Sequence, residues 1–225
     1  MSRLGRFGAL VAFALLAAGV YAATVRGVAD IRYADARELL TRSAVDRRLP
    51  DAGELSIAQA SLREAMKLEP SNPLFVEQLA RVHEMKAIRL ERSDPQRREE
   101  LRQALEQFRA AARMRPASPY VWAAIATVKY RLDEMDFEFY GALQRAERYG
   151  RWEPAIQLEL ADVGLAGWLL LPAQAKILTL DAVARAMPKQ GKEVKRLAQS
   201  HGTLERVCAE EMALRRAPTG LCVKN

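Results

Sequence analysis

Apolar residues recur at helical spacing through the middle of the chain, in pairs of runs separated by a proline turn. The clearest pair lies in 104–126, where the first run ends at Pro116 because proline cannot donate to the helix ladder and disfavours helix in the residue before it. Ser118 can cap a second helix, and Pro119 suits its first turn. The apolar faces of the two runs comprise Phe108, Ala111, Ala112, Trp122, Ile125 and Ala126. The pattern predicts a helix, a sharp turn and a second helix.

This arrangement recurs at 65–80, 111–126 and 146–161. Each copy has Ala at its first position, Pro eight residues later and Ala at its last position. The copies are offset by 46 and 35 residues, and a charged insertion at 91–100 accounts for the longer offset. Small residues at the shared positions let helices approach closely, and the large residues between them fill the gaps.

The repeat resembles the tetratricopeptide repeat, whose period is about 34 residues. The residues that match that family's second helix and its terminal proline are Ala58, Leu62, Ala65 and Pro70, and again Ala104, Phe108, Ala111 and Pro116. Trp122 stands where the first-helix Trp belongs, whereas Phe139 replaces a small residue and makes the third copy degenerate. The expected fold class is all-α, a tetratricopeptide-like antiparallel helical hairpin array preceded by one transmembrane helix.

The amino-terminal segment 7–25 contains no charged residue, and its 19 residues suffice to cross a hydrocarbon core of about 30 Å. Arg3 and Arg6 precede it, so retention of positive charge in the cytoplasm places the rest of the chain across the membrane. We therefore expect a single-pass bacterial inner-membrane protein with a periplasmic globular part. A signal peptide cleaved after Ala22 is the alternative, and it sends the globular part to the same compartment.

The expected organisation has five segments. They are a cytoplasmic N-terminus (1–6), a transmembrane anchor or signal peptide (7–25), a juxtamembrane helix and linker (26–53), a tetratricopeptide-like helical domain (54–216) and a C-terminal tail (217–225). The apolar members of the juxtamembrane helix are Ile31, Ala34, Leu39 and Leu40. Further along, we expect 163–171 to be the tightly packed end of the array and 188–191 to be a turn between two helices.

Composition narrows the function classes without choosing one. Half of the residues are hydrophobic, which is enough for a sizeable core, and the formal net charge is +7. The positive excess is spread among many acids, so it allows weak attraction to anionic lipid or an acidic glycan but demands neither. We expect no nucleic-acid partner.

Cys208 and Cys222 are the only two cysteines. An oxidising periplasm permits a disulfide between them, which would hold the tail on the last helix and contribute about 3 kcal/mol for so small a ring. Two free thiols are the alternative. Neither cysteine has a second ligand at zinc spacing, so we predict no metal site.

No arrangement of residues predicts catalysis. His83 is expected to be buried or to lie at the edge of a groove, and His201 to lie at a helix end. We find no phosphate loop, dinucleotide fingerprint or zinc-protease motif, and we expect neither a cofactor nor enzymatic activity. The acids of 133–138 could pair as in a glycosidase, but a helix rich in Glu and Arg usually carries solvated charges.

A tetratricopeptide-like array implies a concave groove, which in that family is lined by the first helix of each repeat and binds peptides or partner proteins. Transferring the groove positions residue by residue gives Glu77, Arg81, Glu84, Tyr120, Thr127, Tyr130, Arg131 and Asp162. This mixture of charges suits an extended polar segment better than an apolar helix.

The layout after Val25 also resembles the VpsP-type family of bacterial exopolysaccharide biosynthesis proteins. The segments that carry the resemblance are LEPSNP (68–73), RPASPYVWAAIA (115–126), LDEMDFEFYGALQRAERYG (132–150) and WEPAIQLELADVGLAGW (152–168). The amino-terminal apolar segment and Cys208 fit as well. The family is encoded with polysaccharide synthesis and export machinery, and the resemblance implies no catalytic residues.

Three functions follow from these observations. The first is a non-enzymatic membrane-anchored accessory or scaffold protein of exopolysaccharide biosynthesis or export, which binds partner proteins through the groove. The second is direct binding of an acidic polysaccharide by the basic surface, with Arg81 and Arg131 as test positions. The third is a carboxylate-based glycan hydrolase or lyase, which needs two acids facing each other in one cleft.

Overall fold

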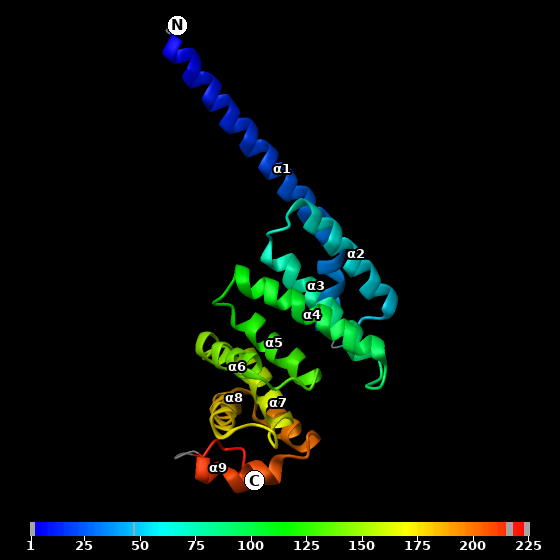
Figure 1. The fold of residues 1–225 in the computed structure, drawn as a ribbon, viewed down its shortest axis with the longest axis vertical. Helices are drawn as coiled ribbons and strands as arrows, with labels where there is room; N and C mark the ends of the chain where they lie inside the picture. Colours follow the sequence, from blue (N-terminus) through cyan, green and yellow to red (C-terminus); the bar gives the residue numbers. More distant parts are fainter. Residues whose placement is uncertain (1–2, 47, 215–217, 223–225) are drawn as a thin grey trace. The chain divides into compact units, whose positions relative to one another are not determined.

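The computed structural model describes residues 3–46, 48–214 and 218–222, and these residues form helices and connections without a strand (Figure 1). The helices are α1 (Arg3–Val45), α2 (Ala52–Leu68), α3 (Pro73–Arg89), α4 (Pro95–Met114), α5 (Pro119–Arg131), α6 (Phe137–Tyr149), α7 (Pro154–Ala166), α8 (Ala173–Ser200) and α9 (Leu204–Leu214). The all-α prediction is confirmed. The chain divides into two compact units, 1–97 and 98–225, and each is described by itself.

The predicted proline turns determine where several helices begin. Pro73, Pro119 and Pro154 each occupy the first helical position, where the missing N–H costs nothing. Asn72 caps α3 by accepting a hydrogen bond from the Leu74 N–H at 3.0 Å. These helix starts are therefore specified by local sequence, through proline at the first turn and, for α3, the Asn72 cap.

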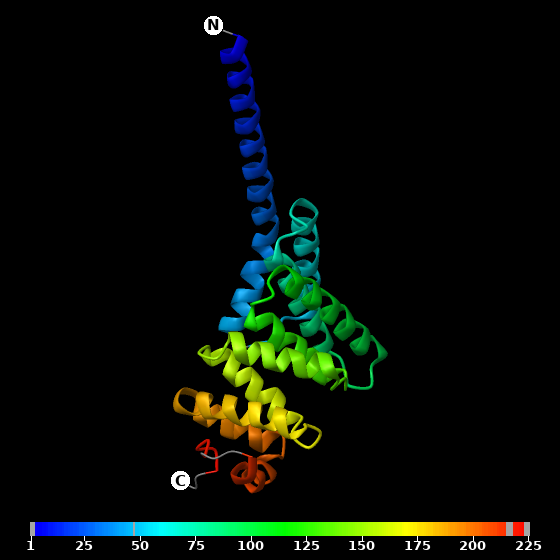
Figure 2. The ribbon, with the colours of Figure 1, turned by 60° about the vertical axis from the view of Figure 1, so that its left-hand side comes forward.

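In the first unit α1 runs without interruption from the apolar segment into the folded part (Figure 2). Within it Leu10–Arg42 is long and apolar enough to cross a membrane, and none of its most apolar window is buried in the protein. Phe13, Leu16 and Tyr21 expose about 70% of their side chains, which excludes burial of this segment in the unit's core.

The carboxyl-terminal half of α1 packs on α2 and α3. The core combines three α1 residues with residues of the hairpin, namely Ala29, Tyr33, Ala36, Leu55, Ala58, Leu62, Ala65, Phe75, Leu79 and Val82. The rings of Tyr33 and Phe75 lie 5.1 Å apart. The prediction that Ile31 belongs to the inward apolar face of this helix is wrong, since Ile31 is 72% exposed. Tyr33 was not among the predicted apolar members, yet it is buried, because its ring is apolar and only its hydroxyl is polar.

In the second unit α5 pairs with α6 and α7 pairs with α8, and α5 also packs on α7. Gly164 lets α7 and α8 approach closely, because a Cβ at this position would lie 2.1 Å from Thr179 Oγ1. The predicted turn at 188–191 is a kink within α8, where Gln190 leaves helical geometry (φ −132°, ψ 23°) two residues after Pro188. Antiparallel pairing of successive helices is the hairpin architecture that the repeat predicts.

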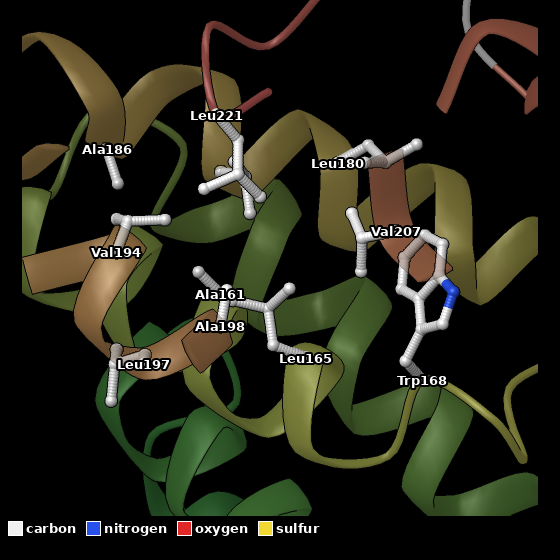
Figure 3. Close-up of a cluster of buried hydrophobic side chains, with 11 residues drawn as sticks. Ala161, Leu165, Trp168, Leu180, Ala186, Val194, Leu197, Ala198, Val207 and Leu221 are labelled. Atoms are coloured by element: carbon white, nitrogen blue, oxygen red, sulfur yellow. The ribbon is translucent and has the colours of Figure 1, made fainter. Parts of the chain in front are cut away.

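The core of the second unit gathers side chains from three helices, from Trp168 after α7 and from the tail (Figure 3). It comprises Ala161, Leu165, Trp168, Leu180, Val183, Ala186, Val194, Leu197, Ala198, Val207 and Leu221. The expectation of tight packing holds for Leu165, Trp168 and Leu171, but Leu169 and Leu170 are 67% and 74% exposed.

The tail closes this core. Cys208 and Cys222 form a disulfide with a Cα–Cα distance of 5.5 Å, and Leu221 next to it is 3% exposed. The Thr219 N–H donates to buried Glu211 Oε1 at 2.6 Å, which satisfies a carboxylate that would otherwise be costly to bury.

Candidate protein-binding face

The predicted groove positions divide between α3 in the first unit and α5 and α7 in the second. On α3, Glu77 and Arg81 are half-buried and Glu84 is buried. Arg81 Nη1 donates to Glu84 Oε2 at 3.2 Å, and buried His83 lies 3.2 Å from Gln59 Nε2 of α2. Glu84 therefore holds the Arg81 side chain in place from a buried position. Of the three predicted groove positions on α3, solvent reaches Glu77 and Arg81.

Hydrogen bonds join α5 to α7 in the second unit. Tyr120 Oη donates to Glu153 Oε2 at 3.2 Å, and Thr127 Oγ1 donates to Glu159 Oε1 at 3.0 Å. Tyr120 is 42% exposed, whereas Thr127 is 9% exposed. Thr127 thus holds the two helices in register, and Tyr120 is an exposed α5 side chain that a partner can reach. We call the exposed surface of these two helices the α5–α7 face.

Asp162 continues this face on α7. Its Oδ1 lies 2.7 Å from Nε2 of His201, the residue that ends α8. Both side chains remain partly exposed, at 45% for Asp162 and 29% for His201. The contact ties the end of α8 to this side of α7.

Tyr130 and Arg131 lie at the carboxyl end of α5, and both are half-buried. The Tyr130 ring lies 3.7 Å from the position of a Cβ built on Gly167, so α5 and the end of α7 are close there. Sequence analysis missed Glu153, Glu159 and His201. Glu159 could have been found because it is three residues from Asp162 and shares its helix face, but His201 is brought here only by the fold.

A second cluster surrounds Lys129, whose side chain is 1% exposed at the end of α5. Its ammonium lies 3.2 Å from Glu134, 2.9 Å from Asp136 and 3.1 Å from Glu138. Glu138 also accepts a hydrogen bond from Arg109 Nε at 2.8 Å. These contacts fasten the α5–α6 connection to the end of α5, where Asp133 adopts φ 63°.

The acids of this cluster do not suit proton donation to a glycosidic oxygen. The Arg109 hydrogen bond and the Lys129 hydrogen bond lower the pKa of Glu138 against the effect of burial. Burial raises the pKa of Asp136, but the hydrogen bonds from Lys129 and two backbone N–H groups outweigh it, and the pKa is lowered. A general acid of a glycosidase needs a raised pKa. The pKa values of Asp136 and Glu138 are instead lowered, which opposes that role.

Chemically, the α5–α7 face offers hydrogen-bond acceptors at the edge of a rigid helical pair. Its carboxylates are Glu153, Glu159 and Asp162, and its donors include the Tyr120 hydroxyl and the Arg131 guanidinium. Within the described residues, no group of three His, Cys, Asp or Glu side chains is placed to hold a metal ion. The arrangement suits recognition of a polar segment carrying positive charge.

Comparison with known proteins adds no relative. No protein-family model, no curated protein and no solved structure matches this chain. The function is therefore inferred from the membrane-length helix, the helical hairpins, the chemistry of the α5–α7 face and the resemblances in the sequence.

Proposed function

We propose that this protein is a membrane-anchored, non-enzymatic accessory protein that holds a partner protein through the α5–α7 face. The observation that carries the proposal is the pairing of a membrane-length apolar helix with a rigid, polar helical surface in one chain. The anchor confines the folded part to a membrane surface, and the face supplies fixed acceptors and donors.

Retention of α1 as an anchor, and not its removal as a leader, is part of this proposal. The core residues Ala29, Tyr33 and Ala36 follow the alternative cleavage point and stay with the folded part in either case. What supports retention is that α1 passes Ala22 without a break and that Arg26 follows it closely. The two charges that precede the apolar segment favour the cytoplasmic side, so the proposed location of the folded part is the periplasm.

The partner class follows from the resemblance to the VpsP-type family and from the charge of the face. The resemblance directs us to proteins of an exopolysaccharide synthesis or export complex. Three carboxylates on the face favour a polypeptide segment with Lys or Arg side chains, and they oppose an acidic glycan at the same place. We therefore rank protein binding above glycan binding for this surface.

In-cell crosslinking of the full chain, followed by purification from membranes and identification of peptides by mass, tests the proposal. The test variants are Tyr120→Ala and Glu153→Gln. The matched controls are Tyr149→Ala on α6 and Glu205→Gln on α9, which are exposed in the second unit and lie outside the face. We expect the test variants to reduce recovery of a protein partner at least fivefold, and the controls to leave it unchanged. Equal recovery with all four variants would contradict a role for this face.

A further inference from the structure

A hollow of about 260 Å³ lies between α6 and the start of α8. Its lining consists of Phe137, Tyr140, Gly141, Gln144, Pro172, Gln174, Ala175 and Leu178. These residues bring two aromatic rings, a leucine and a proline together with two neutral amides. Since the lining includes no charged side chain, the hollow suits an apolar group and opposes an ionic one.

The most exposed large apolar side chain of the described residues stands at the rim of this hollow. Phe137, the first residue of α6, is 95% exposed. Its neighbour Asp136 caps the helix with hydrogen bonds to the Glu138 and Phe139 N–H groups at 3.0 and 3.1 Å. The cap fixes the direction of the first turn, so Phe137 projects from a rigid backbone and not from a loose loop.

The connection from α7 to α8 extends the apolar surface. Leu169 and Leu170, both largely exposed, immediately precede Leu171 and Pro172, and Pro172 lines the hollow together with Phe137. Phe137 in the lining of the hollow, and Leu169 and Leu170 just before Pro172 of that lining, are thus three largely exposed apolar side chains. Exposed apolar groups that gather on a surface often mark an interaction site.

We propose that this surface pairs with the same surface of a second copy of this chain, each Phe137 ring entering the other copy's hollow. A two-fold contact requires a self-complementary patch, and here a projecting ring and a cavity lie side by side on one surface. The cavity is smaller than a typical small-molecule site of about 300–1,000 Å³ and is suited to a single large side chain.

In this pairing the ring of one copy meets Tyr140, Leu178 and Phe137 of the other. Aromatic pairs of this kind favour offset or edge-to-face contact. Gln144 and Gln174 lie at the same place and can exchange amide hydrogen bonds across the contact, which leaves no charge to desolvate. The area is below that of a stable soluble dimer, so the contact depends on confinement of both copies in one membrane, which raises their effective concentration.

This pairing rests on the membrane anchor of the proposed function but not on its binding face, because it uses α6 and α8 whereas partner binding uses α5 and α7. The two proposals can therefore fail separately. Loss of self-pairing leaves the recovery of a partner protein untouched, and the variants Tyr120→Ala and Glu153→Gln leave self-pairing untouched.

Thiol crosslinking of the full chain in membranes tests the pairing. Both native cysteines are joined in a disulfide, so Gln144→Cys introduces the one reactive thiol among the described residues. Treatment with a short bis-maleimide is expected to give a dimer with the mass of two chains plus one linker, identified by a peptide that joins two copies of the segment around position 144. Gln199→Cys, exposed at the other end of α8, is the control and is expected to stay monomeric.

Phe137→Ser in the Gln144→Cys background is expected to reduce the dimer at least fivefold. Trp152→Ser, which removes an 85% exposed aromatic on the α6–α7 connection, is expected to leave the dimer unchanged. Circular dichroism and formation of the native disulfide verify that each variant is folded. A dimer that persists with Phe137→Ser, a dimer lost equally with Trp152→Ser, or a crosslink to a different protein in place of a second copy would each overturn the proposal.

Discussion

The two units close their cores in different ways. In the first unit the membrane-length helix supplies the closing residues, Ala29, Tyr33 and Ala36, from a segment continuous with the apolar span. In the second unit the closing residue Leu221 belongs to an irregular tail, which a disulfide and a hydrogen bond to Glu211 hold in place.

This difference shows that the end of a helical array can be covered either by a long helix or by a tail held in place by a disulfide. A terminal hairpin exposes an apolar face that a neighbouring repeat would cover elsewhere, so it needs a cap. The 43-residue α1 caps by burying two alanines and a tyrosine in its carboxyl-terminal half. A tail of a few residues buries little area, and the cross-link compensates by restricting the unfolded chain.

The largest expected effects come from removing the central aromatic of either core. Phe75→Ala and Trp168→Ala each delete a fully buried side chain, and such deletions cost about 3–5 kcal/mol. Hydrogen exchange read by mass is the measurement. If the cores close separately, Phe75→Ala deprotects α2 and α3, whereas Trp168→Ala deprotects α7 and α8. Deprotection of both units by each variant would contradict the claim that the two cores close separately.

Removing the disulfide between Cys208 and Cys222 is expected to have the next largest effect on stability. Cys208 and Cys222 are 14 residues apart, and a ring of this size stabilises by about 3 kcal/mol in the chain-entropy model. The double variant Cys208→Ser with Cys222→Ser should lower the unfolding temperature of the second unit and increase exchange in α9. The first unit, which has no cysteine, is the internal control. An unchanged α9 would show that Leu221 and Thr219 hold the tail without the disulfide.

Much of this fold could be predicted from the sequence, because its signals are local. Pro73, Pro119 and Pro154 mark helix starts through their own backbone restrictions, and Ala58, Leu62 and Ala65 show their inward face by spacing alone. Trp168 was expected in a packed end for the same reason. Such residues need no knowledge of what they contact.

The candidate site was less predictable because its contacts are distant in the sequence. The resemblance to the tetratricopeptide repeat indicated Thr127 as a groove position, but Thr127 is buried and donates a hydrogen bond to Glu159, which lies 32 residues away. Asp162 meets His201 across 39 residues. Phe137 is 95% exposed because it begins α6, and nothing in the local pattern of apolar residues marks that exposure.

A smaller effect is expected from Lys129, which fastens the α5–α6 connection. Lys129→Met leaves Glu134, Asp136 and Glu138 with less compensation, and we expect a loss of about 1–3 kcal/mol, because the carboxylates keep part of their hydration. Chemical unfolding monitored by exchange in α5 and α6 measures it. Arg196→Met, which breaks an exposed ion pair with Glu193 on α8, is the matched control and should cause no measurable change. Equal effects of the two variants would mean that burial adds nothing to the Lys129 contacts.

The smallest expected effect is the acid sensitivity of the start of α2 in the first unit. Arg48 donates two hydrogen bonds to Glu54, at 2.6 and 2.5 Å, and the Asp51 N–H donates a third at 2.8 Å. The Arg48 hydrogen bonds and then the backbone one lower the pKa of Glu54 from 4.5 to about 2. Because the folded-state pKa is depressed, this contribution is complete above pH 4.5 and is lost as the pH falls toward 2.

Exchange at the start of α2, followed from pH 6 to pH 2.5 after correction for the intrinsic rate, should therefore increase in the wild type below pH 4.5. Glu54→Gln should be less protected at pH 6 and should flatten this dependence. Glu205→Gln on α9 should leave it unchanged. The same titration should still loosen α6 in the second unit, where the lowered pKa of Glu138 has the same sign. If Glu54→Gln flattened the acid response of both units, the separate closing of the two cores would be wrong.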